Sequence, residues 1–193
     1  MKEILSRVSW LSLPDEFVES EPHKAVYKEV VELTKKARSL KQEKRLAKQL
    51  NGKRQPASGA RWGARRDVLL PRFLLEAKTT KATSFSLDLR DLAHLKRQAF
   101  AIGKTPAYVI QLEDKEELVV LPFHELTEDD VKGAPVKELT MYGKDSVTID
   151  ATMAYKACVE CLIHILETSH GRYVLLSYER FLHIAKKGVD DAD

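Results

Sequence analysis

Cysteine is scarce in this sequence: only two of the 193 residues are cysteines. Two thiols cannot build the disulfide framework of a small secreted domain, so that class of protein is excluded. Long apolar runs are also absent, and no stretch approaches the ~20 residues that a membrane-spanning helix requires. Charged side chains interrupt the first residues, Met1 to Leu13, and no small-residue cleavage site of a signal peptide follows them. We therefore expect a cytoplasmic protein without a membrane segment.

Acidic residues are nearly absent from one stretch of the chain, residues 34–66. This stretch holds twelve Lys and Arg residues and a single acid, Glu43, so its formal charge is +11. Because the whole chain carries +3, the remainder carries −8. A segment this basic is typical of a surface that binds nucleic-acid phosphates. The alternative is a solvated helix face followed by a polar loop, but the acids that normally intersperse such a face are missing.

Hydrophobic residues make up 44% of the chain and charged residues 32%, which is the composition of a folded globular protein. The apolar spacing from Val26 to Leu50 predicts one long helix or two consecutive helices, starting at Ser20-Glu21-Pro22 and ending at Asn51-Gly52. The residues that follow predict a β-hairpin, a helix and two strands. Their expected ranges are 67–70 with 73–78 for the hairpin, 91–102 for the helix, and 107–112 and 118–123 for the strands.

The C-terminal third shows weaker signals. Residues 127–147 indicate a loop or small insertion, 149–168 a helix, 173–176 a strand and 178–186 a closing helix. The pattern predicts an α/β fold with a central mixed sheet of about five strands flanked by helices. We expect an N-terminal helical extension over 1–40, a core over 41–126 and a helical appendage over 127–193 that packs on the core.

Three residues of the predicted hairpin carry chemistry: Asp67, Glu76 and Lys78. Period-two alternation places Glu76 and Lys78 on one face of the second strand. Two carboxylates from adjacent strands supply the oxygen ligands that a hard divalent cation needs. Such an ion orients a scissile phosphate, activates water and neutralises charge on the leaving oxygen, while the nearby ammonium holds that water or stabilises the pentavalent phosphorane. The alternative is a surface salt bridge on a half-exposed strand.

Several features favour the chemical interpretation. Glu76 and Lys78 directly follow Phe73-Leu74-Leu75, a run too apolar for a simple surface strand. The basic loop from Lys53 to Arg66 leads straight into Asp67. The helix that bears the lone acid Glu43 precedes that loop.

Glu43, Ser58-Gly59-Ala60, Asp67 and Glu76-Ala77-Lys78, taken together, resemble the PD-(D/E)XK nuclease pattern, and most closely the archaeal-type Holliday junction resolvases and their phage-encoded relatives. The resemblance covers about Lys41 to Phe123. It implies a restriction-endonuclease-like core and Mg²⁺ as the cofactor, with Mn²⁺ as a substitute. Arg66 stands where the family usually has proline or glycine before the aspartate.

The resemblance also assigns roles. Glu43 is the helix glutamate, Ser58 contacts DNA or the metal-bound water, Asp67 and Glu76 are metal ligands together with the Ala77 carbonyl, and Lys78 is the catalytic lysine. The implied activity is Mg²⁺-dependent hydrolysis of DNA four-way junctions, leaving 5′-phosphate and 3′-hydroxyl ends. Symmetric cutting of two strands requires a two-fold homodimer, and we look for its interface in the residues predicted as the 149–168 helix. The expected DNA contacts from the basic loop are Lys53, Arg54, Ser58, Arg61, Trp62, Arg65 and Arg66.

Other candidates have two interpretations each. Gln98 either faces the active site or belongs to a solvated helix face, and Thr79 either touches the DNA backbone or simply forms strand. Trp62 either stacks on a base or packs against the hairpin. Cys158 and Cys161 near two histidines suggest zinc, but the spacing of Ala154, Cys158, Cys161, Leu162 and Ile165 predicts an apolar helix stripe with core cysteines.

Two rival functions remain open at this point. One is a repair or restriction-like nuclease that acts on duplex or single-stranded DNA. The other is a DNA-binding module that kept the nuclease fold and lost catalysis. Comparing the cleavage of different DNA structures distinguishes the first rival from a junction resolvase. A test for binding of Mg²⁺ or Mn²⁺ distinguishes the second rival from an active nuclease.

Overall fold

The computed structural model describes residues 21–55, 67–113 and 115–190. The chain divides into two compact units, Met1–Arg38 and Ser39–Asp193. The division falls inside the long helix α2 (Glu21–Gln49). Among the described residues, no helix has the length and apolar character needed to cross a membrane.

The end of α2 follows the prediction from the sequence. Asn51 adopts a left-handed conformation with φ of 50°, and the Gly52 N–H donates to the Ala47 carbonyl at 2.8 Å, which is how helices commonly terminate. A Cβ atom on Gly52 would lie 2.9 Å from Val68 Cγ1, so only glycine allows the chain to pass this closely over β2. The expected N-terminal cap, Ser20, lies outside the described residues.

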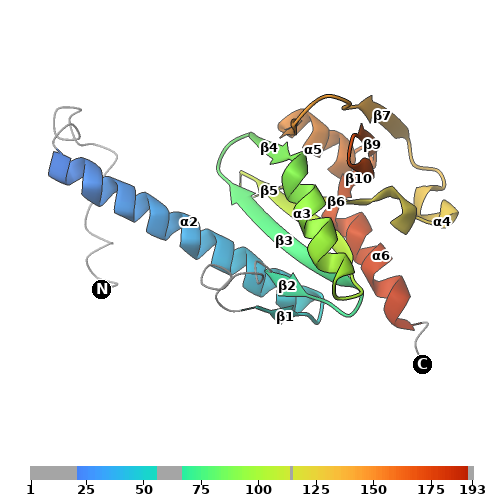
Figure 1. Cartoon of the computed structure of the whole chain (residues 1–193), viewed down its shortest axis with the longest axis horizontal. Coiled ribbons are helices and arrows are strands. Elements are labelled where there is room, and N and C mark those ends of the chain that lie inside the picture. The colour runs from blue at the N-terminus through green and yellow to red at the C-terminus, as the bar shows by residue number, and fades with distance from the viewer. Residues whose placement is uncertain (1–20, 56–66, 114, 191–193) are drawn as a thin grey trace. The chain divides into compact units, whose positions relative to one another are not determined.

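The second unit is built on an eight-stranded mixed sheet with the order β1-β2-β3-β5-β6-β10-β9-β7 (Figure 1). The pairs β3–β5 and β7–β9 are parallel and the other neighbours are antiparallel. The strands are β1 (Lys53–Arg54), β2 (Val68–Leu69), β3 (Phe73–Thr80), β5 (Thr105–Leu112), β6 (Glu117–Pro122), β7 (Val136–Thr140), β9 (Ile163–Thr168) and β10 (Gly171–Ser177). A separate two-stranded sheet pairs β4 (Ser84–Asp88) with β8 (Ser146–Asp150).

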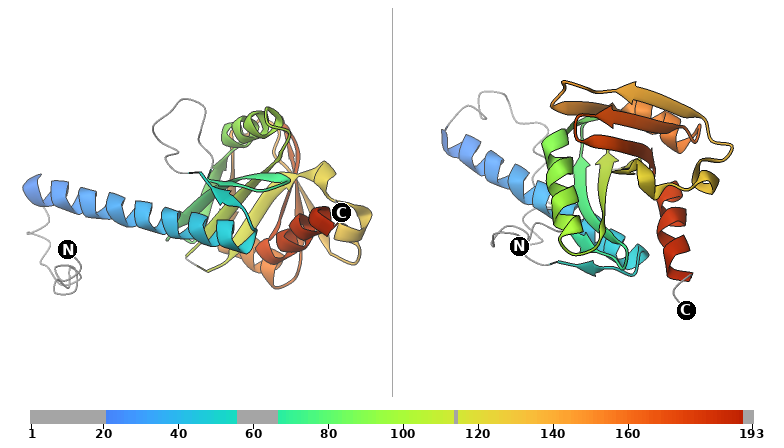
Figure 2. Two further views of the ribbon diagram at one scale, coloured as in Figure 1. Left: turned by 90° about the horizontal axis from the view of Figure 1, so that it is seen from below. Right: turned by 45° about the vertical axis from the view of Figure 1, so that its right-hand side comes forward.

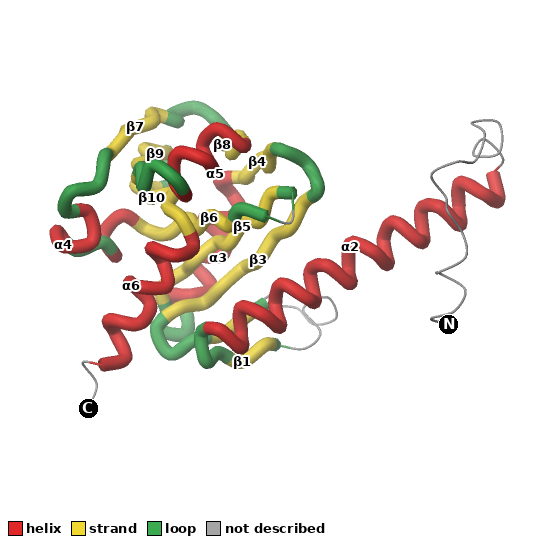
Figure 3. The backbone as a smooth tube through the Cα atoms, turned by 180° about the vertical axis from the view of Figure 1, so that it is seen from behind, coloured by secondary structure: helices red, strands yellow, loops and turns green. Residues whose placement is uncertain are grey.

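Helices cover both faces of the large sheet (Figures 1 and 2). On one face, α3 (Leu89–Phe100) and α5 (Ala151–Cys158) pack with Leu74, Tyr108 and Val120 in one apolar core. On the other face, α6 (Tyr178–Asp190) and the C-terminal end of α2 pack over a second core, and Figure 3 shows these two helices from behind. Strands buried on both sides read as nearly continuous apolar runs, and β6 and β10 are of this kind.

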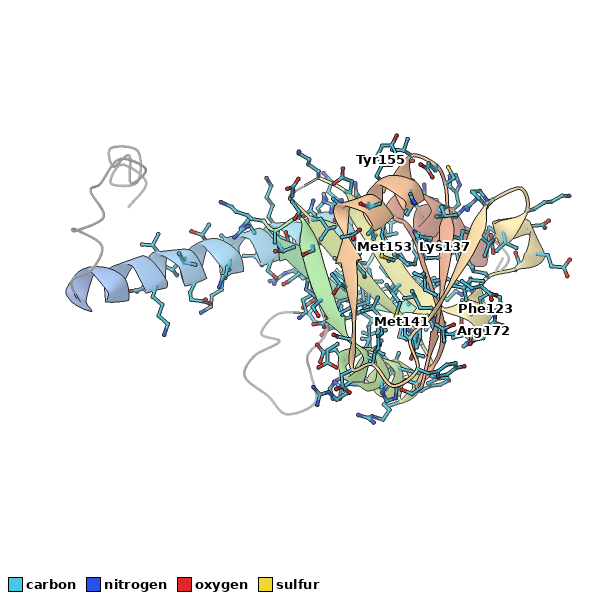
Figure 4. All side chains as sticks on the ribbon, turned by 90° about the horizontal axis from the view of Figure 1, so that it is seen from above. Phe123, Lys137, Met141, Met153, Tyr155 and Arg172 are labelled. Carbon is cyan, nitrogen blue, oxygen red and sulfur yellow. The ribbon has the colours of Figure 1, made fainter. Side chains whose placement is uncertain are left out.

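Two short helical turns join the halves of the sheet. The turn η2 (Phe123–Glu125) follows β6, and α4 (Glu128–Val131) begins with a capping box in which Thr127 and Asp130 satisfy each other's backbone N–H. The guanidinium of Arg172 lies 4.3 Å from the centre of the Phe123 ring (Figure 4). This cation–π contact ties β10 to η2.

The structure confirms the α/β class, the mixed sheet and the elements expected between residues 67 and 123. It corrects the C-terminal third. The sheet has eight strands instead of about five, because β1, β7 and β9 were not predicted, whereas the strand expected over 173–176 is present as β10. Residues 127–147, expected as a loop, contain α4 and β7 and reach into β8.

The helix predicted over residues 149–168 is wrong. Helix α5 ends at Cys158, and β9 begins at Ile163 after Cys161 has turned into the left-handed region with φ of 55°. The region 127–193 is therefore not a helical appendage, since β10 pairs directly with β6 in the main sheet. The dimer interface that we sought on an apolar helix over 149–168 loses its basis with that helix.

Candidate active site

Asp67 is positioned by the β2–β3 hairpin, one residue before β2. Val68 pairs with Leu75, and continuing this antiparallel register by one residue places Asp67 opposite Glu76. Asp67 is only 8% exposed, and its Oδ2 accepts a 2.7 Å hydrogen bond from the Ala77 N–H. The hairpin thus holds a buried carboxylate against β3, beside a second acid.

Glu76 and Lys78 share one face of β3, as the sequence predicts. Phe73, Leu75 and Ala77 point into the opposite core, while Glu76 and Lys78 are half-buried. The Lys78 Nζ lies 2.7 Å from Glu76 Oε1. The three residues expected to act together therefore meet at the β2–β3 edge of the sheet.

Glu43 lies on α2, which precedes the basic loop in the sequence, and it reaches the same region. It is 9% exposed. Its Oε1 accepts a hydrogen bond from Ser39 Oγ at 3.2 Å, and its Oε2 pairs with Arg54 Nη1 at 3.3 Å. Its negative charge acts on Asp67, so the helix glutamate belongs to the same electrostatic cluster.

The carboxyl group of Asp67 has a strongly raised pKa. Burial raises the pKa of Asp67 to about 7, and the negative charges of Glu76 and Glu43 add to this rise, against the Ala77 N–H and the Lys78 ammonium. Desolvation and like charges both disfavour an ionised carboxylate. Near neutrality the site therefore holds protons that a bound cation would displace.

The environment favours the charged form of Lys78, whereas it disfavours the charged form of Asp67. Burial lowers the pKa of its ammonium, but the adjacent Glu76 carboxylate and the charge of Asp67 raise it, and the net shift is upward. The lysine therefore stays protonated at neutral pH. It can donate hydrogen bonds and stabilise negative charge, whereas it cannot serve as a general base.

The donor set fits Mg²⁺ better than a metal that needs a complete protein cage. Among the described residues, no cluster of three or more His, Cys, Asp and Glu side chains is arranged to hold a metal ion. Mg²⁺ is commonly held by one or two carboxylates together with waters and substrate phosphates. Asp67 and Glu76 are two such carboxylates, and burial together with the charge of Glu76 raises the pKa of Asp67.

The carbonyl of Ala77 is a third oxygen in this place. In an extended strand, the N–H and the C=O of one residue point to the same side. The Ala77 N–H donates to Asp67, so the Ala77 carbonyl points to the same side of β3, beyond the last β2–β3 pair of the ladder. Asp67, Glu76 and the Ala77 carbonyl are therefore the residues that could hold the ion.

The sequence did not point to a second polar group that supports the site. Gln42 Nε2 donates to the Lys78 carbonyl at 3.5 Å and to Glu117 Oε1 at 3.3 Å. Glu117 is itself buried and forms an ion pair with Arg45. This network fixes α2 against the ends of β3 and β6. Gln42 and Glu117 lie 75 residues apart, so no local pattern could reveal them.

Tyr108 and Asp91 also interact electrostatically with the charged residues of the site. Tyr108 pairs with Glu76 in the β3–β5 register, and burial, with the charge of Glu76 next, raises the pKa of its hydroxyl. Asp91, in the first turn of α3, raises the pKa of Lys78. The electrostatic interactions of Glu76 and Lys78 therefore include residues of β5 and α3.

The remaining candidates divide between described and undescribed residues. Lys53 is exposed and Arg54 is half-buried. Thr79 is half-buried, and its Oγ1 contacts Gln111 Oε1 at 3.5 Å. Gln98 is half-buried on α3, next to the buried Ala99. The candidates that lie outside the described residues are Ser58, Arg61, Trp62, Arg65 and Arg66.

The two cysteines do not both lie in the core, as the sequence suggested. Cys158 is half-buried against the apolar core beneath α3 and α5. Cys161 lies after α5 and is exposed. His164 is buried in β9, and His170 is exposed. These four residues form no metal cluster among those described.

This chain matches no protein-family model, no curated protein and no solved structure. Its function is therefore inferred below from its own side chains.

Proposed function

We propose that this protein is a Mg²⁺-dependent, structure-selective DNA endonuclease with a restriction-endonuclease-like core, and that it resolves four-way junctions. One observation carries the proposal. Asp67, Glu76 and Lys78 converge on one edge of the sheet, where burial and the charge of Glu76 raise the pKa of Asp67 to about 7.

The residues divide the chemistry among them. Asp67, Glu76 and the Ala77 carbonyl would hold the ion, which supplies Lewis-acid activation of water and charge neutralisation at the scissile phosphate. Lys78, kept protonated by the neighbouring acids, donates hydrogen bonds to the attacking water or to phosphate oxygens as negative charge develops. Glu43 holds Arg54 near the site, where the guanidinium can contact a DNA phosphate.

The DNA surface continues from the site along the basic segment. Exposed lysines on the C-terminal part of α2 and on β1 lie in the same unit as the catalytic cluster. Each lysine that neutralises a phosphate releases counterions, so binding weakens steeply with salt. The described members of this surface are Lys41, Lys44, Lys48 and Lys53.

A cleavage assay tests the proposal. The wild-type protein, Asp67→Asn and Lys78→Ala are incubated with a four-way junction in the presence and absence of Mg²⁺. We expect cleavage only with Mg²⁺, and a loss of about a thousandfold or more in each variant, while junction binding persists. Wild-type rates in either variant would remove the assignment.

Asp130→Asn is the matched control, because Asp130 is a similarly buried aspartate in the α4 capping box. We expect this variant to cleave normally below its melting temperature. Parallel reactions with a nick, a flap and a plain duplex test the choice of substrate. Preferential cutting of the duplex would favour the repair-like or restriction-like nuclease. No cutting of any substrate, combined with no binding of Mg²⁺ or Mn²⁺, would favour the inactive DNA-binding module.

A further inference from the structure

Helix α2 carries exposed apolar side chains at alternating spacings of three and four residues. Val30 is 40% exposed, Leu33 58% and Leu40 36%, and Ala37 between them is exposed as well. In the sequence, Val26 continues the same spacing toward the start of the helix. Apolar residues repeating every 3.5 positions are the signature of a two-stranded coiled coil. Such a stripe on a highly charged helix indicates a helical partner.

The stripe defines the heptad positions of the helix. Val30 and Ala37 occupy position a, and Leu33 and Leu40 occupy position d. The flanking g positions then hold Glu29 and Lys36. In coiled coils, the charges at the flanking positions select the partner, its orientation and its register.

We propose that the α2 helices of two copies of this chain pack antiparallel around a two-fold axis. In this arrangement Val30 packs against Leu33 of the second copy, and Glu29 pairs with Lys36 of the second copy. Two-fold symmetry forms every contact twice. The proposal does not depend on the nuclease assignment.

The orientation follows from the charges. In a parallel pair, the g residue Lys36 would lie beside the following e residue, Lys41, of the second helix, and like charges there oppose pairing. In the antiparallel pair, g faces g, and Glu29 meets Lys36. Both side chains are exposed, and neither forms an ion pair with another described residue. By contrast, Lys35 on the outer face already pairs with Glu32 at 3.0 Å.

The register follows from the same residues. Sliding the antiparallel pair by one heptad in either direction places Glu29 opposite Glu29 or Lys36 opposite Lys36. A slide by two heptads would pair Lys36 with Glu43, but Glu43 is buried beside Asp67. Only the proposed register joins opposite charges that are both free to meet.

Charge reversal tests orientation and register together. In sedimentation equilibrium of the full chain, we expect Glu29→Lys and Lys36→Glu each to weaken dimerisation about tenfold, since each turns two attractions into two repulsions. The double variant E29K/K36E should restore the wild-type dissociation constant. Lys28→Glu is the matched control, because it makes the same charge change at an outer position and should leave dimerisation unchanged.

Leu33→Glu tests the apolar stripe itself, and the exposure of Leu33 means that the helix should still fold, as circular dichroism can check. We expect a monomer. A monomeric wild type at about 100 μM, well above the micromolar range of weak specific association, would overturn the proposal. So would tighter dimers of Lys36→Glu, which indicate parallel helices, or failure of the double variant to restore pairing. A Leu33→Glu variant that still dimerises but loses DNA affinity would make the stripe a DNA surface instead.

Discussion

Two aspartates of this protein are equally hidden from solvent and differ in almost every other respect. Asp67 is 8% exposed and Asp130 is 9% exposed. Asp130 pairs with Lys187 at 2.7 Å and accepts hydrogen bonds from the Thr127 N–H and hydroxyl. From the described residues, Asp67 accepts one backbone hydrogen bond, donated by the Ala77 N–H, and two other acids act on it.

The difference appears in the ionisation of the two groups. Burial works to raise the pKa of Asp130, but the hydrogen bonds from Lys187 and Thr127 outweigh it, and the pKa is lowered. The pKa of Asp67 is raised to about 7. A buried carboxylate with enough donors stabilises the fold, whereas one without them costs stability. Asp130 is therefore a structural residue, whereas the environment of Asp67 costs stability and suits the ligand role that we propose for it.

Replacing aspartate by asparagine should raise the free energy of unfolding at position 67 and lower it at position 130. Asp67→Asn should give the larger effect. The unfolded aspartate ionises near 3.8 and the folded one near 7, so the folded state binds the extra proton between these values. Stability is therefore lost as pH rises from about 4 to about 7. At about pH 8, Asp67→Asn should remove a penalty of the order of 4 kcal/mol.

Urea unfolding of the wild type and Asp67→Asn between about pH 4 and 8 measures this difference. The gap between the two proteins should widen as pH rises through about 7 and vanish near pH 4. Equal stabilities across the whole range would show that Asp67 carries no ionisation penalty and would break the comparison.

Asp130→Asn should lower stability at neutral pH by about 2 kcal/mol, because it weakens the capping box and removes the ion pair. The folded pKa of Asp130 lies below its unfolded value. Its contribution is therefore present above the unfolded pKa of about 4 and is lost as pH falls through the folded value. Lys187→Ala is the partner variant. If either variant unfolds at the wild-type urea midpoint, Asp130 does not hold α4 to α6.

The smallest expected effect is stabilisation by the metal. At about 10 mM Mg²⁺ and a dissociation constant of about 1 mM, binding to the folded state adds about 1.4 kcal/mol. Thermal unfolding should show this gain in the wild type and in Asp130→Asn, but not in Asp67→Asn. An equal gain in all three proteins would indicate metal binding elsewhere.

The grouping of Asp67, Glu76 and Lys78 could be predicted because the sequence signals for it are local. Glu76 and Lys78 share a face by strand periodicity, and Asp67 lies at the start of the same hairpin. The Gln42–Glu117 bond could not be predicted, since it joins α2 to β6 between residues 75 positions apart in the sequence. The hairpin, α3, β5 and β6 were predictable for the same local reason, whereas β4, which pairs with the distant β8, was not predicted.

Much of the C-terminal third could not be predicted from the sequence, for two physical reasons. Strand β9 (IHILET) is buried at five of its six positions and has no period-two alternation, and periodicity alone cannot distinguish such a strand from a helix. Ala154 and Cys158 do belong to a helix, but Cys161 turns the chain out of it. The edge strand β7 gave the opposite problem, because four of its five residues are exposed and offer no apolar pattern.

Calorimetric titration of the wild type with Mg²⁺ and Mn²⁺ at about pH 7, in two buffers of different ionisation enthalpy, tests the ligand role of Asp67 most directly. Because the carboxyl of Asp67 is about half protonated at that pH, binding should release about half a proton per ion. Asp67→Asn should show neither the binding nor the proton release, and Asp130→Asn should show both. Identical titrations of the wild type and Asp67→Asn would contradict the account.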